Sequence, residues 1–152
     1  AHIEAAQQSG LPLIIHSRAA DKDMADILSS EFTNAPYSCV MHCFSSGEAL
    51  AKTVLDLGFY LSMSGIAAFP KNMELLEIFK RAPIEQILVE TDSPYLAPPP
   101  NRGKQNEPGF TRFTAEIAAD AFGMSYGDFA IQTEQNFERL FSKAVQYEKG
   151  VL

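Results

Sequence analysis

A short apolar run followed by a helical pattern occurs four times along this chain, and this alternation restricts the fold more than any other feature. The runs cover residues 11–16, 37–42, 59–65 and 86–92. Each has the length of a buried strand, and each is followed by apolar residues spaced three or four apart. Strands that alternate with helices form βα units, whose strands lie parallel in one sheet. The sequence therefore predicts an α/β fold.

Helix signals accompany every apolar run. We expect helices from Asp21, from about Ser46 to Gly58, from about Asn72 to Pro83, and from Pro108 to Gly123. A last helix is expected after the capping sequence SYGD (125–128). Units of about 20–30 residues fit either an open doubly wound sheet or a (β/α)₈ barrel, and a complete barrel needs roughly 250 residues. Four units make half of such a barrel.

The chain of 152 residues has the length of one domain, and no linker-like segment divides it. We therefore expect residues 1–152 to form a single domain. Its opening, AHIEAAQQSG, reads as the end of a helix closed by Gly10 and has no initiator Met. This opening leads us to expect further sequence upstream, and an upstream half would supply the four missing units.

Composition indicates the cellular compartment and limits the classes of binding partner that we expect. Cys39 and Cys43 would lie roughly 13 Å apart in one extended strand, too far for a disulfide. Unpaired thiols suit a reducing compartment, so we expect a cytoplasmic protein. No apolar stretch approaches the roughly 18–20 residues that cross a bilayer, and no membrane association is expected. The net charge of −7 argues against broad attraction to nucleic acid but permits a local basic patch.

Three candidate metal ligands stand at the ends of predicted strands. His16 ends the first run, His42 ends the second, and Asp92 ends the fourth. The carboxyl ends of parallel strands form one rim, where the active sites of such folds lie. Imidazole nitrogen and carboxylate oxygen suit Zn²⁺, Mn²⁺, Fe²⁺ or Ni²⁺. For one histidine alone, a structural hydrogen-bonding role is the simpler interpretation, but three such residues at equivalent positions favour a metal site.

Further polar residues lie close to these candidates in the sequence. Glu90 is two residues before Asp92, so both side chains are expected on the same face of the strand. Glu90 is either a further ligand or supporting group, or the partner of a nearby cation. Arg18, Arg102 and Lys104 follow strand ends and favour an anionic substrate such as phosphate, although simple solvation also explains each one alone.

Several motifs together resemble one known family. In chain order they are LPLIIHSR (11–18), MHCFSSG (41–47), FYLSMSGI (59–66), VETDSPYLAP (89–98) and NRGKQNEP (101–108). They resemble the carboxyl-terminal half of the TatD family of metal-dependent deoxyribonucleases, and TEQNFERLF (133–141) is similar to that family's last helix. The resemblance covers nearly the whole chain. It implies strands 5–8 of a (β/α)₈ barrel of the metallo-dependent hydrolase class.

The resemblance also implies a function and roles for single residues. The implied activity is nuclease hydrolysis of phosphodiester bonds, in DNA rather than RNA, with divalent cations (Mg²⁺, Mn²⁺ or Zn²⁺), two in an intact site. His16, His42 and Asp92 match metal ligands of the family, and Asp92 would also orient or deprotonate the attacking water. The family's other ligands, a His-x-His pair and a Glu, belong to the upstream half. The fragment alone is therefore expected to be inactive.

Two other functions remain open at this point. One is a metallohydrolase of the same barrel class that acts on a small ester, lactone or amide. Such an enzyme would close its site with apolar loops and would not cleave DNA. The other is a non-catalytic binding domain with an open sheet, in which the histidines and Asp92 are structural. It predicts a stable monomer that holds no metal.

Overall fold

The computed structural model describes residues 1–148 and 150, and at its centre is a four-stranded parallel sheet. The strands lie side by side in the order of the sequence: β1 (Leu13–Ile15), β2 (Cys39–Met41), β3 (Tyr60–Met63) and β4 (Ile87–Val89). All three pairings are parallel, and Val40 pairs with both Ile14 and Tyr60. Each predicted apolar run contains one strand, so the predicted α/β fold with a parallel sheet is confirmed.

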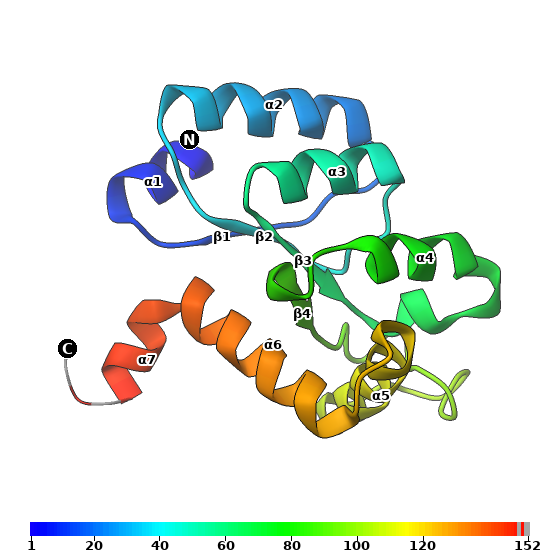
Figure 1. Ribbon diagram of the computed structural model, residues 1–152. Coiled ribbons are helices and arrows are strands. Elements are labelled where there is room, and N and C mark those ends of the chain that lie inside the picture. Colours follow the sequence, from blue (N-terminus) through cyan, green and yellow to red (C-terminus); the bar gives the residue numbers. More distant parts are fainter. Residues whose placement is uncertain (149, 151–152) are drawn as a thin grey trace.

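One helix precedes β1 and further helices follow each strand, as Figure 1 shows. They are α1 (His2–Ser9), α2 (Asp21–Asn34), α3 (Glu48–Asp56), α4 (Met73–Arg81), α5 (Thr111–Phe122), α6 (Tyr126–Leu140) and α7 (Ser142–Glu148). Short 3₁₀ turns lie between them: η1 (Gly65–Ala68), η2 (Pro70–Asn72), η3 (Ile84–Gln86) and η4 (Pro108–Phe110). The predicted helices are confirmed to within a few residues. The two turns η1 and η2 and the last helix α7 were not expected.

The predicted helix boundaries have the expected local chemistry. Gly10 and Gly123 close α1 and α5 in the left-handed conformation, with φ of 64° and 66°. Glycine takes this conformation without the steric cost that a Cβ would add. At the start of α6, the Ser125 hydroxyl oxygen accepts a hydrogen bond from the Asp128 amide. These signals are local in sequence, and this is why they could be located before the fold was known.

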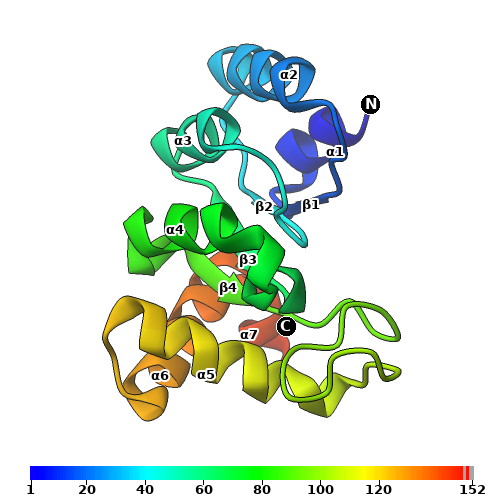
Figure 2. The ribbon, with the colours of Figure 1, turned by 90° about the vertical axis from the view of Figure 1, so that its right-hand side faces the viewer.

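One face of the sheet carries the main hydrophobic core. Strand residues that point to this face pack against α2 to α5, which Figure 2 shows stacked in sequence order along the sheet. The strand residues are Ile15, Cys39, Met41, Leu61, Met63 and Ile87. Four phenylalanines complete this core, each no more than 2% exposed: Phe44, Phe59, Phe79 and Phe129. Aromatic side chains of this size account for much of the apolar area that folding buries.

The opposite face of the sheet is only partly covered. Val40, Tyr60 and Leu88 point to it, and Leu140 at the end of α6 packs against them together with Phe141. Ile14 of β1 remains 62% exposed. A cavity of about 580 Å³ lies between this face and the helices α5 and α6. We call this surface the inner face, because it faces the interior of the barrel that the sheet would form if it closed.

Within the described residues, no helix combines the length and the apolar character that crossing a bilayer requires. The longest, α6, has 15 residues and carries charged side chains along its length.

Candidate metal centre

The main chain places His42 and Glu90 at the same rim of the sheet. The His42 amide donates to the Ile15 carbonyl at 2.9 Å, and the Glu90 amide donates to the Met63 carbonyl at 2.9 Å. Parallel pairing therefore continues one residue beyond the ends of β2 and β4. Because side chains alternate along a strand, His42 and Glu90 fall on the inner face, and both line its cavity.

The imidazole of His42 lies between two carboxylates. Its Nδ1 is 2.6 Å from Glu90 Oε1, and its Nε2 is 3.6 Å from Asp92 Oδ1. The three side chains are between 20% and 32% exposed. A carboxylate at Nδ1 favours the tautomer with the proton on that nitrogen, which leaves the lone pair of Nε2 free for a ligand. The arrangement aims one nitrogen and one carboxylate at a common point.

These three residues form a group suited to a divalent cation. Ligand atoms of His42, Glu90 and Asp92 all lie within 4.8 Å of one another. The separation of 3.6 Å between His42 Nε2 and Asp92 Oδ1 is close to the spacing of about 3.4 Å for two ligands of one tetrahedral ion. In addition, Glu90 Oε1 is buried and meets no donor of the described residues at hydrogen-bond geometry; its close contact with His42 Nδ1 is therefore electrostatic rather than a hydrogen bond. The donor set therefore fits a metal ion.

Burial raises the pKa of the Glu90 carboxyl above its ordinary value. The nearby charge of Asp92 adds to this effect, while the Ser62 hydroxyl, the His42 ring and the Cys43 amide oppose it. A carboxylate that is costly to ionise inside the protein gains from a cation placed beside it. The raised pKa of Glu90 and the geometry of the group therefore both favour a bound cation.

The predicted ligand His16 stands beside this group rather than within it. Its ring centroid is 5.8 Å from that of His42, with the rings tilted by 41°. Its side chain is exposed at the end of β1. The structure thus brings His16, His42 and Asp92 to one rim, as the strand ends predicted. Glu90 contacts the His42 ring directly, with 2.6 Å between its Oε1 and the ring Nδ1.

The cysteine that follows His42 has no features of an activated nucleophile. Burial raises the pKa of the Cys43 thiol, although the Ser64 hydroxyl and Arg18 act in the opposite direction. The sulfur lies 3.1 Å from the Ser64 hydroxyl oxygen. A thiol that is hard to ionise is a poor nucleophile. Both cysteines are free, which agrees with the expected absence of a disulfide between them.

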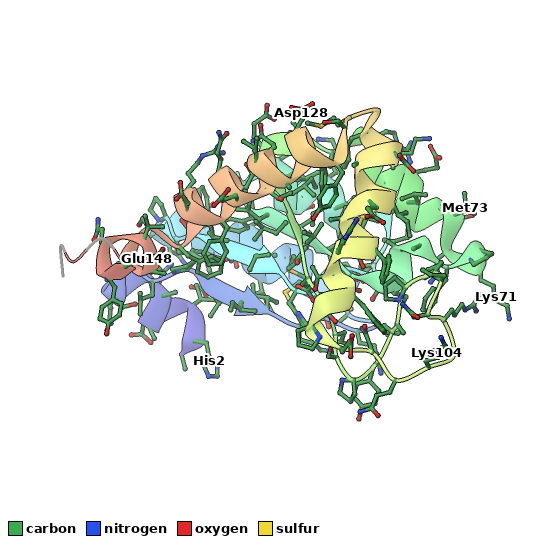
Figure 3. The ribbon with its side chains drawn as sticks, turned by 90° about the horizontal axis from the view of Figure 1, so that it is seen from below. His2, Lys71, Met73, Lys104, Asp128 and Glu148 are labelled. Carbon is green, nitrogen blue, oxygen red and sulfur yellow. The ribbon has the colours of Figure 1, made fainter. Side chains whose placement is uncertain are left out.

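The predicted phosphate-binding cations lie at the rim and away from the carboxylates. Arg18 follows β1 and is exposed. The guanidinium of Arg102 stacks over the Phe69 ring at 4.7 Å from its centroid. Lys104 is exposed, and Figure 3 shows it projecting from the long loop after β4. None of the three contacts His42, Glu90 or Asp92 through a salt bridge in the described part of the chain.

Sequence reasoning missed two residues near the site. Ser62 is 3% exposed on the inner face, and its hydroxyl lowers the pKa of the Glu90 carboxyl. Asn106 is 4% exposed and bonds to the segment that carries Asp92. For Ser62 a signal existed, since the alternation along β3 places it beside the inner face. Asn106 lies in an irregular loop, where no periodicity indicates its position.

Comparison with known proteins gives the same family over most of the chain. The family described as TatD related DNase matches residues 1–142. A protein of Mycobacterium tuberculosis named as an uncharacterized metal-dependent hydrolase TatD is 42% identical over 140 residues, which are 92% of this chain and 52% of that protein. A protein of Edwardsiella piscicida named 3'-5' ssDNA/RNA exonuclease TatD is 32% identical, over 95% of this chain and 57% of that protein.

A solved structure confirms the architecture. The crystal structure of YJJV, a TatD homologue from Escherichia coli K12, superposes with a TM-score of 0.83 at 22% identity, over 92% of this chain and 53% of that one. The predicted partial barrel is therefore confirmed. The chain spans about half the length of the curated relatives it matches.

Proposed function

The chain belongs to the family of TatD-related DNases, and on that premise we propose that it is the carboxyl-terminal half of a metal-dependent hydrolase that cleaves phosphodiester bonds in DNA. The observation that carries the proposal is the His42 imidazole held between Glu90 and Asp92 at the carboxyl ends of the strands. The exonuclease named among the relatives supports a nucleic acid substrate. We place the protein in the cytoplasm because both of its thiols are free.

A bound divalent ion would supply Lewis-acid chemistry, acidifying a water molecule and polarising a phosphoryl oxygen. His42 would bind it through Nε2, with His16 and Asp92 as further ligands. Glu90 keeps the proton of His42 on Nδ1 and adds negative charge to the site. Asp92 is the residue at the mouth that accepts a proton from the attacking water. Mg²⁺, Mn²⁺ and Zn²⁺ are the candidate ions, with two in a complete site.

The substrate would be held by its charge. Arg18, Arg102 and Lys104 would contact phosphate oxygens as DNA approaches the rim. The planar guanidinium of Arg102 can bond two oxygens while its face rests on the Phe69 ring. These cations lie in a protein with a net charge of −7, so they concentrate attraction for an anion at one place.

We further propose that an upstream half completes the site. It would contribute the His-x-His pair and the Glu that the family uses, and its strands would pair with the edges of β1 and β4. The inner face, with its cavity of about 580 Å³, is the surface that those strands would cover. Residues 1–152 would then be strands 5–8 of one barrel.

The test uses the full-length protein with His42→Ala and Asp92→Ala variants. We expect both to lose DNA hydrolysis by at least about 100-fold while their circular dichroism spectra stay unchanged. Lys52→Ala, on the exposed side of α3, is the control and should retain full activity. Near-wild-type cleavage by either variant at limiting metal would contradict the mechanism. Metal-dependent hydrolysis of small esters without any cleavage of DNA would instead favour the small-molecule hydrolase.

A further inference from the structure

Asp92 stands in irregular chain rather than on a strand. The strand β4 ends at Val89, and residues 90–95 have no regular structure other than turns. The main chain turns back at Asp92, whose carbonyl accepts a hydrogen bond from the Tyr95 amide at 2.7 Å. A ligand on a loop is held less precisely than one on a strand unless other residues support it. The structure contains such a support.

The side-chain amide of Asn106 donates hydrogen bonds to this loop on both sides of Asp92. Its Nδ2 donates to the Thr91 hydroxyl oxygen at 2.9 Å and to the Tyr95 carbonyl at 2.6 Å. Its main-chain amide donates to the Pro94 carbonyl at 3.0 Å. Three hydrogen bonds from one residue therefore bracket the ligand, two from the side chain and one from the main chain of a residue that is 4% exposed.

The rest of this network is also complete. The Thr91 and Ser93 hydroxyl oxygens lie 2.7 Å apart, and the oxygen of the Asn106 side chain accepts from the Glu107 amide at 3.0 Å. Every polar atom of the Asn106 amide thus has a partner. A fully paired buried network holds its members in one arrangement, and removal of its central donor leaves several groups unpaired at once.

We propose that Asn106 is the positioning residue for Asp92. It acts by fixing residues 91–95 so that the Asp92 carboxylate stays opposite His42 Nε2, and it touches neither metal nor substrate itself. The inference rests on the proposed function, in which Asp92 is a metal ligand. Asn106 also ends the loop that carries Arg102 and Lys104, so the same residue ties the candidate phosphate-binding loop to the candidate ligand.

The chain offers a matched control in Asn136. This residue is 0% exposed, and its Nδ2 donates to the Ile84 and Ile87 carbonyls, both at 2.7 Å. Like Asn106, it donates two hydrogen bonds from its side-chain amide, here both to main-chain carbonyls and at the opposite end of β4. Loss of either amide removes two hydrogen bonds made by a buried asparagine, whereas only Asn106 bonds to the loop that carries Asp92.

The experiment compares Asn106→Ala, Asn136→Ala and Asp92→Ala in the full-length protein. Mn²⁺ affinity is measured by titration calorimetry, and Tm is measured on the metal-free protein. Amide hydrogen exchange of the peptide spanning residues 90–96 reports the loop without any metal. We expect both asparagine variants to lower Tm, while only Asn106→Ala weakens Mn²⁺ binding, by about 10- to 100-fold, and speeds exchange of that peptide.

The outcomes separate this inference from the proposed function. If Asp92→Ala weakens Mn²⁺ binding and Asn106→Ala behaves like Asn136→Ala, the positioning role is wrong and the ligand assignment stands. If Asp92→Ala leaves the affinity unchanged, the ligand assignment and the positioning role both fall. Should Asn106→Ala not fold, Thr91→Val takes its place, because it removes one acceptor of the amide and keeps the side-chain shape. An affinity equal to that of the wild type in Thr91→Val would then overturn the proposal.

Discussion

His42 meets a different carboxylate at each of its ring nitrogens, and the two carboxylates lie in different surroundings. Glu90 contacts Nδ1 at 2.6 Å and is the less exposed of the two, whereas Asp92 stands 3.6 Å from Nε2 at 32% exposure. The inner carboxylate therefore sets the tautomer and the outer one shares a cation with the ring. This difference gives two similar side chains separate tasks.

Glu90→Gln is predicted to separate stability from metal binding. In the wild type, burial raises the pKa of Glu90 from its ordinary value of 4.5. At a pH below 4.5 the carboxyl is protonated in both the folded and the unfolded protein, and the variant gains nothing. As the pH rises toward the raised pKa, the unfolded state loses its proton first, so the free energy of unfolding of the metal-free wild type falls.

The expected result is a higher Tm for metal-free Glu90→Gln than for the wild type at pH 7, and no difference near pH 4. Mn²⁺ affinity should fall by about 10- to 100-fold, because an amide carries no charge to orient His42 or to attract the ion. Thermal unfolding with a chelator present and calorimetric titration check the two parts. An unchanged Tm at pH 7 would show that the buried charge of Glu90 is compensated without a metal.

Among single residues, the site residues that could be predicted from the sequence are those whose position follows from a strand. His16, His42 and Asp92 could be grouped because parallel strands end at one rim, and Glu90 joined them through the two-residue alternation. Asn106 could not be predicted, since its partners lie 11 and 15 residues away across an irregular loop. The stacking of Arg102 on Phe69 could not be predicted either, because it depends on how two loops meet.

At the scale of elements, the end of β3 and the loop after β4 touch through main chain. A Cβ placed on Gly65 would lie 2.1 Å from the Leu96 carbonyl oxygen and 3.1 Å from the Pro98 nitrogen. Neither contact can be relieved by rotating a flexible side chain. The loop can therefore approach the start of η1 this closely only because Gly65 has no Cβ.

Gly65→Ala is accordingly predicted to lower the free energy of unfolding by about 1–3 kcal/mol, because the added methyl group overpacks a contact between main-chain segments. Gly127→Ala in α6 is the control. A Cβ there meets only the Ser125 hydroxyl at 3.9 Å, and alanine in a helix stabilises by roughly 0.5–1 kcal/mol relative to glycine. Chemical denaturation of both variants tests the pair. If Gly65→Ala proved as stable as Gly127→Ala, the loop would accommodate the added methyl group without a loss of stability.

Helices and strands were predictable to the extent that their signals are local. The cap at Ser125 and the glycines at positions 10 and 123 marked real helix ends. The three- or four-residue spacing of apolar residues assigns Ile27 and Phe137 to apolar helix faces, yet these side chains are 49% and 46% exposed. Periodicity identifies the apolar side of a helix, but the exposed fraction depends on which neighbours cover it. The turn η1 packs against the distant loop at Leu96, so no local signal reveals it.

At the scale of the whole molecule, the inner face and the two outer strands control behaviour in solution. Unpaired strand edges and exposed apolar surface promote association between copies. We predict that the 152-residue chain by itself self-associates, and that Ile14→Lys shifts it toward monomer. In the full-length protein the same substitution should instead destabilise, because the proposed upstream strands would cover the lysine.

Sedimentation velocity of the short chain and thermal unfolding of the long one measure these two effects. Met73→Lys is the control, because Met73 is 55% exposed at the start of α4, away from the inner face, and is labelled in Figure 3. It should change neither quantity. Identical sedimentation of wild type and Ile14→Lys would mean that the inner face does not drive the association.

The half-barrel itself was predictable from the fourfold repeat of strand and helix, since βα units leave few alternatives once they are counted. The choice between an open sheet and a barrel was not decided by the repeat, because both use the same unit. The family motifs favoured the barrel, and the superposition on half of a solved TatD homologue agrees.

The two buried asparagines at the ends of β4 have a consequence for how freely this strand can vary. In the described chain β4 is three residues long and pairs with β3 alone, so a slide of two residues would keep the same side chains facing inward. Such a slide would carry Glu90 and Asp92 about 6.6 Å away from His42. It would also break the hydrogen bonds that Asn136 and Asn106 donate before and after the strand. The register of β4 is therefore held by hydrogen bonds from outside the strand as well as by its pairing with β3.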